Sequence, residues 1–208
     1  MYIKMYFKKT LRIILRIFFR YDWWHTSPIE NRKYVNDIIT EVNKHNSRDL
    51  LLEIGCGLGD IIGNSKFQNK LFYDTDQNVL NAARFIHKFR KLKSHNEFKV
   101  FDFLKHSIKD SRIYDVVVLV NWLHTYDSVT VAPKIKAVVN NNMKKDSLLI
   151  FDLIPPTSSN LFNRSAGQFF HHSVGDLIKE KDFDIKILDG YRFDRQIVIA
   201  KLRKFIVK

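Results

Sequence analysis

The sequence predicts one doubly wound α/β fold, in which a mostly parallel sheet has an antiparallel last strand and follows N-terminal helices. Short apolar segments typical of strands alternate with helical segments, a pattern that gives a parallel sheet covered on both faces. Val116–Val120 is apolar at every position, as a central strand buried on both faces should be. The last two strand segments have only residues 190–195 between them, too few for a helical crossover, so we expect them to pair antiparallel.

The elements follow in a regular order. A helix is expected over residues 1–20, and the capping box Ser27-Pro28-Ile29-Glu30 predicts a second helix that runs to about Asn43. Strands are expected at 50–54, 70–74, 97–101, 115–120, 147–153, 183–189 and 196–203, with helical segments at 60–66, 77–91, 130–143 and 173–181. We therefore divide the chain into N-terminal helices at 1–45 and one α/β domain at 46–208. With 208 residues and 45% hydrophobic side chains, the chain can bury a sizeable core.

Positive charge is concentrated at the N-terminus. The whole chain carries +13, and residues 1–20 contain basic side chains without any acid. On a helix the basic residues form one stripe, made of Lys4, Lys8, Arg12, Arg16 and Arg20. The apolar residues fall mainly on the other side, at Ile3, Phe7, Leu11, Ile14, Leu15 and Phe18, and Trp23 and Trp24 follow.

This amphipathic segment has two interpretations. Residues 1–24 could lie in the interface of an anionic membrane, at its cytoplasmic side. Alternatively, the helix packs its apolar face on the domain as a lid. The longest apolar run in it is Ile17–Phe19, so the segment is far too polar to span a bilayer. Nucleic acid is a less favoured partner of the basic charge.

The single cysteine excludes a disulfide framework and a cysteine-based zinc site, and suits a reducing, cytoplasmic compartment. The informative motif is an apolar strand at 50–54 that leads into three glycines at alternate positions, where backbone N–H groups can approach a ligand closely. A dinucleotide fingerprint needs glycine where this chain has Asp60, and the lysine of a nucleotide-triphosphate loop is missing. The motif therefore argues against a dinucleotide and against a nucleotide triphosphate as the ligand.

Glu53, Gly55, Gly57 and Gly59 match the pattern [E/D]-x-G-x-G-x-G, and over residues 48–203 the chain resembles the class I S-adenosylmethionine-dependent methyltransferases. Further matches occur in family order: LFYD ends at Asp74, VFDF contains Asp102, and YDVVVLVNWLH leads from the fourth strand to His124. Before the fifth strand, Asp146 and Ser147 stand where the family has glycines.

The resemblance implies a Rossmann-like fold that binds S-adenosylmethionine and uses no metal. Asp74 would bind the ribose hydroxyls, and Asp102 would hold the adenine amino group. The full set of cofactor-binding residues that the resemblance implies is Glu53, Gly55, Gly57, Gly59, Asp74, Asp102, Phe103 and Asn121.

We expect an S-adenosylmethionine-dependent methyltransferase that O-methylates a small-molecule, carbohydrate or lipid-linked acceptor at the cytoplasmic membrane face. His124, just after the fourth strand, is the candidate general base, and Tyr126 and Asp127 are candidates for the acceptor pocket. His171 and His172 are adjacent, so their side chains should diverge rather than share a metal. The alternatives are an RNA methyltransferase, whose binding would weaken steeply with salt, and a non-catalytic scaffold with this fold.

Overall fold

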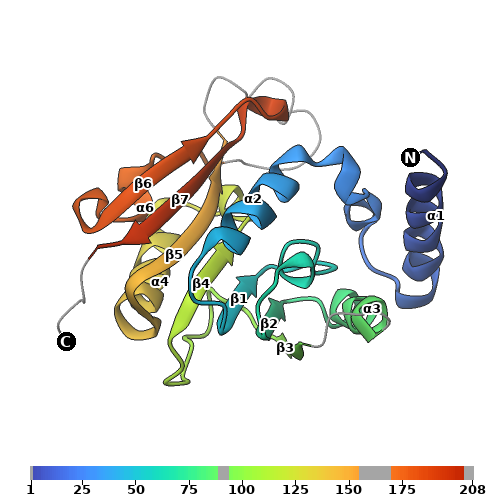
Figure 1. Ribbon diagram of the computed structural model, residues 1–208, viewed down its shortest axis with the longest axis horizontal. Helices are drawn as coiled ribbons and strands as arrows, with labels where there is room; N and C mark the ends of the chain where they lie inside the picture. The colour runs from blue at the N-terminus through green and yellow to red at the C-terminus, as the bar shows by residue number, and fades with distance from the viewer. Residues whose placement is uncertain (1, 89–93, 155–169, 204–208) are drawn as a thin grey trace.

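The computed structural model describes residues 2–88, 94–154 and 170–203, and its core is a seven-stranded sheet (Figure 1). The strand order is β3-β2-β1-β4-β5-β7-β6, and β7 runs antiparallel to both neighbours. The strands are β1 (Leu50–Ile54), β2 (Asn69–Asp74), β3 (His95–Val100), β4 (Tyr114–Leu119), β5 (Met143–Leu153), β6 (Phe183–Leu188) and β7 (Gln196–Leu202). The expected mostly parallel sheet with an antiparallel last strand is confirmed.

Helices cover both faces of this sheet. Apolar side chains of α2 (Lys33–Lys44) and Leu80 of α3 (Gln77–Lys88) pack with one set of strand residues. Side chains of α4 (Ser128–Asn142) and of the short α6 (Val174–Leu177) pack with the other set. Every residue of β4 is buried, as its continuous apolar run predicts.

Helix α1 (Tyr2–Phe19) does not touch the sheet. It lies outside α3, at the end of the molecule away from β6 (Figure 1). Leu15, Tyr21 and Leu58 form a small separate core with Val79 and Ala82 of α3.

The basic side of α1 faces the domain. Arg12 is 8% exposed and binds both carboxylate oxygens of Asp60, at 2.5 and 3.0 Å. The same guanidinium donates to the backbone carbonyls of His25 and Ser27, and Lys8 binds Glu30 at 2.5 Å. The expected lid would pack its apolar face inward, whereas of the apolar side only Leu15 is buried, and Leu11, Ile14 and Phe18 are exposed. Ile3 and Phe7 lie outside the described side chains.

The predicted capping box is wrong. Ser27 makes no side-chain cap, Ile29–Asn31 is a short 3-10 turn, and α2 begins only at Lys33. Helix α1 engages this segment instead: the Glu30 carboxylate accepts from Lys8, and the Ser27 carbonyl accepts from Arg12.

Other helix boundaries also differ. Residues 60–66 form a turn and the 3-10 segment Ile62–Asn64 instead of a helix, because the Ile62 N–H donates to the buried Glu53 carboxylate. Segment 173–181 is split into α6 and a 3-10 turn at Glu180–Asp182. The expected last three residues of α3, 89–91, lie outside the described residues.

Strand β5 begins at Met143, four residues earlier than expected. Its first part contains a register shift against β4, and there Asp146 adopts a φ of +71°. This is the left-handed conformation that the family's glycine would adopt at no cost. Aspartate tolerates it, and the side chain binds Lys201 at 2.8 Å.

We predict that Arg12→Met lowers the free energy of unfolding by about 2 kcal/mol, because Asp60 remains buried with Arg32 as its remaining cation. Trypsin should also cleave residues 1–20 faster. Urea unfolding and limited proteolysis measure both effects, and Lys9→Met, at an exposed position of the same helix, should change neither. Equal behaviour of the two variants would mean that α1 is held by its apolar contacts alone.

Candidate functional site

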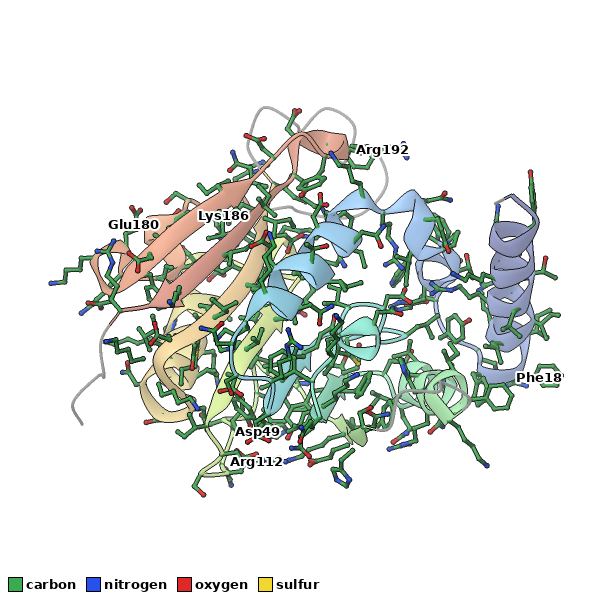
Figure 2. The ribbon with its side chains drawn as sticks, viewed as in Figure 1. Phe18, Asp49, Arg112, Glu180, Lys186 and Arg192 are labelled. Atoms are coloured by element: carbon green, nitrogen blue, oxygen red, sulfur yellow. The ribbon has the colours of Figure 1, made fainter. Side chains whose placement is uncertain are left out.

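The candidate residues gather at one edge of the sheet, where β1, β2, β4 and β5 have their carboxyl ends and antiparallel β7 begins. Figure 2 shows the two ends of the sheet, since Asp49 precedes β1 and Arg192 lies in the turn before β7. Ligands of open α/β sheets bind at the carboxyl edge, in the crevice where the strand order reverses. Here the order reverses between β1 and β4.

Two positions in the loop after β1, Gly55 and Gly57, accept only glycine. Gly55 and Gly57 have φ values of +72° and +53°, and the N–H groups of Gly55 and Cys56 both donate to the carbonyl of Tyr73. A Cβ atom on Gly55 would lie 2.4 Å from Trp122 Cδ1, and one on Gly57 would lie 2.8 Å from His25 Nδ1. Side chains are therefore excluded both by backbone conformation and by close neighbours.

Glu53 lies beneath this loop, in β1. Its carboxylate is 4% exposed and accepts the Ile62 N–H at 3.0 Å, so it fixes the chain that leaves the loop. Burial raises the pKa of Glu53 to about 8. Near neutral pH the side chain is therefore largely protonated.

Asp74 ends β2 directly beside the glycine loop. One carboxylate oxygen accepts the Gly57 N–H at 2.8 Å, and the other accepts the Asp76 N–H at 3.1 Å. Each oxygen can accept a second hydrogen bond, so the carboxylate keeps capacity for a ligand. Burial raises the pKa of Asp74, and the two N–H donors oppose that rise.

Asp102 and Phe103 follow β3 along the same edge. Asp102 accepts the backbone N–H groups of Leu104 and Lys105, and its other oxygen lies 3.1 Å from the Lys105 ammonium. Phe103 is buried and packs edge-on against Trp122, with ring centroids 5.7 Å apart. The indole N–H of Trp122 donates to the Ile54 carbonyl, so an aromatic pair flanks the glycine loop.

His25 is a site residue that sequence reasoning missed. It lies in the 3-10 turn Trp23–Thr26 after α1, directly over Gly57, and Asp74 is among the charges that act on it. Burial lowers the pKa of His25, so its ring is neutral at neutral pH. No local pattern could have revealed the contact, because it depends on the path by which α1 returns to the domain.

A second group, of which the sequence analysis named only Asn121, connects four elements on the other side of the edge: α2, the loop after β4, β5 and the turn before β7. Arg195 binds the fully buried Asp152 of β5 at 2.9 Å and donates to the side chain of Asn121. The Asn121 side chain also accepts from the Tyr34 hydroxyl, and its backbone N–H donates to Asp152. Asn121 has a φ of +77°, so this network holds the loop after β4 in a left-handed turn. Arg195, at the end of the turn before β7, is 9% exposed.

His124 lies in the next turn of the same loop, in the 3-10 segment Leu123–Thr125, and is 9% exposed. Burial lowers the pKa of His124; Asp152 opposes this, and Arg195 and His172 add to it. Tyr126 is 40% exposed beside Trp122, whereas Asp127 caps α4 through the Thr130 N–H. The same loop thus carries a buried, neutral imidazole and the aromatic pair Trp122 and Tyr126.

The two adjacent histidines bind backbone carbonyls. His171 contacts the Ile154 carbonyl at 2.9 Å, and His172 contacts the Tyr126 carbonyl at 2.9 Å. Within residues 2–88, 94–154 and 170–203, no cluster of histidine, cysteine and acidic side chains could hold a metal ion. Cys56 is buried in the glycine loop, and burial raises the pKa of its thiol well above the usual range, so it is an unreactive small residue there.

Known proteins resemble this chain in structure only: no family model matches it, and no curated protein sequence does. Magnesium protoporphyrin IX methyltransferase from Synechocystis PCC 6803, with bound SAH, superposes with a TM-score of 0.66 at 16% identity, covering 83% of each chain. The N-methyltransferase NodS from Bradyrhizobium japonicum WM9, in complex with S-adenosylhomocysteine, gives 0.63 at 16% identity, covering 83% of this chain and 86% of NodS. A methyltransferase from Clostridium acetobutylicum ATCC 824 gives 0.61 at 20%, with 83% and 92% covered.

The chain has the fold of the S-adenosylmethionine-dependent methyltransferases. In this fold the residues that the motif pattern selects lie along one edge of the sheet: Glu53, the three glycines and Asp74 are in or after β1 and at the end of β2, and Asn121 and His124 follow β4. Asp102 and Phe103 lie one strand beyond β2, at the end of β3.

We predict that Glu53→Gln removes a pH dependence of stability. The folded-state pKa of Glu53 is raised above its unfolded value, so the folded protein binds more protons and loses stability as pH rises from about 4.5 to about 8. The variant should show a smaller loss over this range, with the difference reaching a few kcal/mol. Urea midpoints at several pH values measure it. Parallel curves for the two proteins would show that Glu53 is ionised in the fold.

Proposed function

We propose that the protein is an S-adenosylmethionine-dependent methyltransferase that O-methylates a small-molecule, carbohydrate or lipid-linked acceptor at the cytoplasmic face of a membrane. The cofactor assignment rests on the arrangement of Gly57 and Asp74. Gly57 lies in a turn with no room for a side chain, and its N–H donates to the buried Asp74 carboxylate at the end of β2. Two of the superposed methyltransferases contain S-adenosylhomocysteine, which supports the same assignment.

The chain's own groups fit this cofactor. Asp74 would accept from the ribose hydroxyls with the capacity its carboxylate retains, and the backbone of residues 55–59 would face the amino-acid part. Asp102 would accept from the adenine amino group, next to the apolar surface of Phe103. A sulfonium and an ammonium make the ligand's amino-acid end cationic, and Glu53 and Asp74 place two carboxyl groups near that end of the site.

The cofactor supplies an activated methyl group with a good leaving group, so the protein's task is to orient the acceptor. Asn121 holds the loop after β4 through Arg195, Asp152 and Tyr34, and this fixes the loop that carries His124. Because burial lowers the pKa of His124, the ring can accept a proton from an acceptor hydroxyl at neutral pH. Trp122 and Tyr126 provide apolar surface for the acceptor's carbon skeleton.

The acceptor class rests on what surrounds the site. The described loops after β2 and β4 are short, at residues 75–76 and 120–127, and α1, which binds Asp60 next to the glycine loop, has an exposed apolar face. Both features suit a small or lipid-linked acceptor better than a folded macromolecule.

We predict that S-adenosylhomocysteine binds and NAD does not. In calorimetric titrations Asp74→Ala should weaken S-adenosylhomocysteine binding by about tenfold or more, because a charge-assisted hydrogen-bond pair is lost. Asp49→Ala, at the opposite end of β1, should leave the affinity unchanged (Figure 2). Equal affinities of the two variants would refute the ribose contact, and absence of binding to wild type would favour a scaffold with this fold.

We predict that His124→Asn lowers the rate of methyl transfer by about 10²–10⁴-fold while S-adenosylhomocysteine affinity stays within twofold, about the loss expected for a general base. Transfer of a tritiated methyl group from S-adenosylmethionine to a membrane lipid extract provides the assay. The wild-type rate should begin to fall only at a pH below the usual range of histidine, because burial lowers the pKa of His124 and the ring stays neutral above that point. A variant with an unchanged rate and pH profile would make His124 a packing residue.

A further inference from the structure

The outward face of α1 is apolar. Ile13 and Ile17 are four residues apart, as are Ile14 and Phe18, so they form two neighbouring rows on the helix. Their exposed fractions are 43%, 70%, 44% and 76%, in that order. Figure 2 shows Phe18 at the outer edge of the molecule, pointing away from the sheet. We call these rows, with Tyr6, the outer face of α1.

This orientation is the reverse of what an ordinary surface helix adopts. A helix of a soluble domain turns its apolar stripe toward the core and its charges toward water. In α1 the buried positions are Arg12 and Leu15, and the exposed Lys8 reaches back to the domain at Glu30. Asp60 and Glu30 supply the acids that accept the two cations. The domain therefore binds the polar side and leaves the apolar side exposed.

Two further exposed aromatic residues follow the helix. Trp23 and Trp24, in the 3-10 turn after α1, are 68% and 56% exposed. Monomeric proteins rarely expose contiguous apolar rows such as those of the outer face unless the surface binds something. Indole rings are also the side chains most enriched at the boundary between lipid and water.

The charges around the outer face favour an anionic bilayer over a second copy of the chain as its binding partner. Lys9 and Arg20 are exposed on the flank of these rows, and residues 1–21 contain no acid. Two copies that joined through this face would bring these cations together, which costs free energy, whereas anionic headgroups would neutralise them. None of the described helices is long and apolar enough to cross a bilayer, so α1 would lie in the interface plane.

We propose that the outer face of α1, with Trp23 and Trp24, docks the protein onto the surface of an anionic lipid bilayer. The apolar rows enter the boundary between headgroups and acyl chains, and Lys9 and Arg20 contact the phosphates. Arg12 does not contact lipid, because it is buried on Asp60. This proposal does not depend on methyl transfer, although it would place the site beside membrane-bound acceptors.

The test is co-sedimentation of the full chain with vesicles of phosphatidylcholine alone and of phosphatidylcholine mixed with phosphatidylglycerol. Wild type should bind the mixed vesicles at least tenfold more tightly, and added salt should weaken the binding. The double variant Ile17→Asp/Phe18→Asp should lose at least tenfold in affinity. Val129→Asp, which replaces an 83% exposed aliphatic residue of α4 on the other side of the sheet, should bind as wild type does.

Unchanged vesicle binding by the Ile17/Phe18 variant would overturn the proposal. So would a concentration-dependent dimer, seen by sedimentation, that this variant abolishes, because the face would then serve a second copy. Lys9→Gln/Arg20→Gln should reduce the preference for phosphatidylglycerol, and an unchanged preference would contradict the charge argument. S-adenosylhomocysteine titration of each variant separates the two proposals, since affinity should be retained whether or not vesicles bind.

Discussion

The N-terminal third of the molecule depends on one buried carboxylate. Asp60 closes the glycine loop and is 7% exposed, between the guanidinium groups of Arg12 and Arg32. Burial alone would raise its pKa, but the two arginines outweigh that effect and hold the pKa below its usual range. A charge so placed is tolerable only while its partners remain. The loop that forms the site therefore requires α1 and the start of α2 to be docked.

The same contacts set the position of His25. Arg12 binds Asp60 and, with the same guanidinium, the backbone carbonyls of His25 and Ser27. The ring of His25 lies over Gly57, so the position of α1 also determines how the glycine loop is covered. A single polar cluster thus explains both why the apolar side of α1 is exposed and why the loop is covered.

Features that depend on nearby residues could be predicted from the sequence. The continuous apolar run of β4, the glycines at positive φ and the acid that ends β2 follow from patterning and turn chemistry within a few residues. The missed features join distant positions: Arg12 and Asp60 are 48 residues apart, and Arg195 and Asn121 are 74 apart. The capping box failed for the same reason, since Lys8 binds Glu30 across 22 residues and removes its capping role. Local signals specify the sheet and the loop, while long-range charge pairing decides what covers them.

The two halves of the site differ in how their charges are balanced. On the side of β4 and β5, Asp152 is paired with Arg195, and burial lowers the pKa of His124, so this half presents little net charge. On the side of β1 and β2, burial raises the pKa of both Glu53 and Asp74, and the bonds to backbone N–H groups only partly oppose this. A cation entering beside them would favour their ionised forms and gain attraction in return. The arrangement therefore suits a ligand whose positive charge lies near the glycine loop. Its reacting group would face the uncharged residues after β4 and β5, across the point where the strand order reverses. Because burial keeps the His124 ring neutral, its lone pair can accept the acceptor's proton in the proposed reaction, while the loop orients the acceptor toward the cationic ligand.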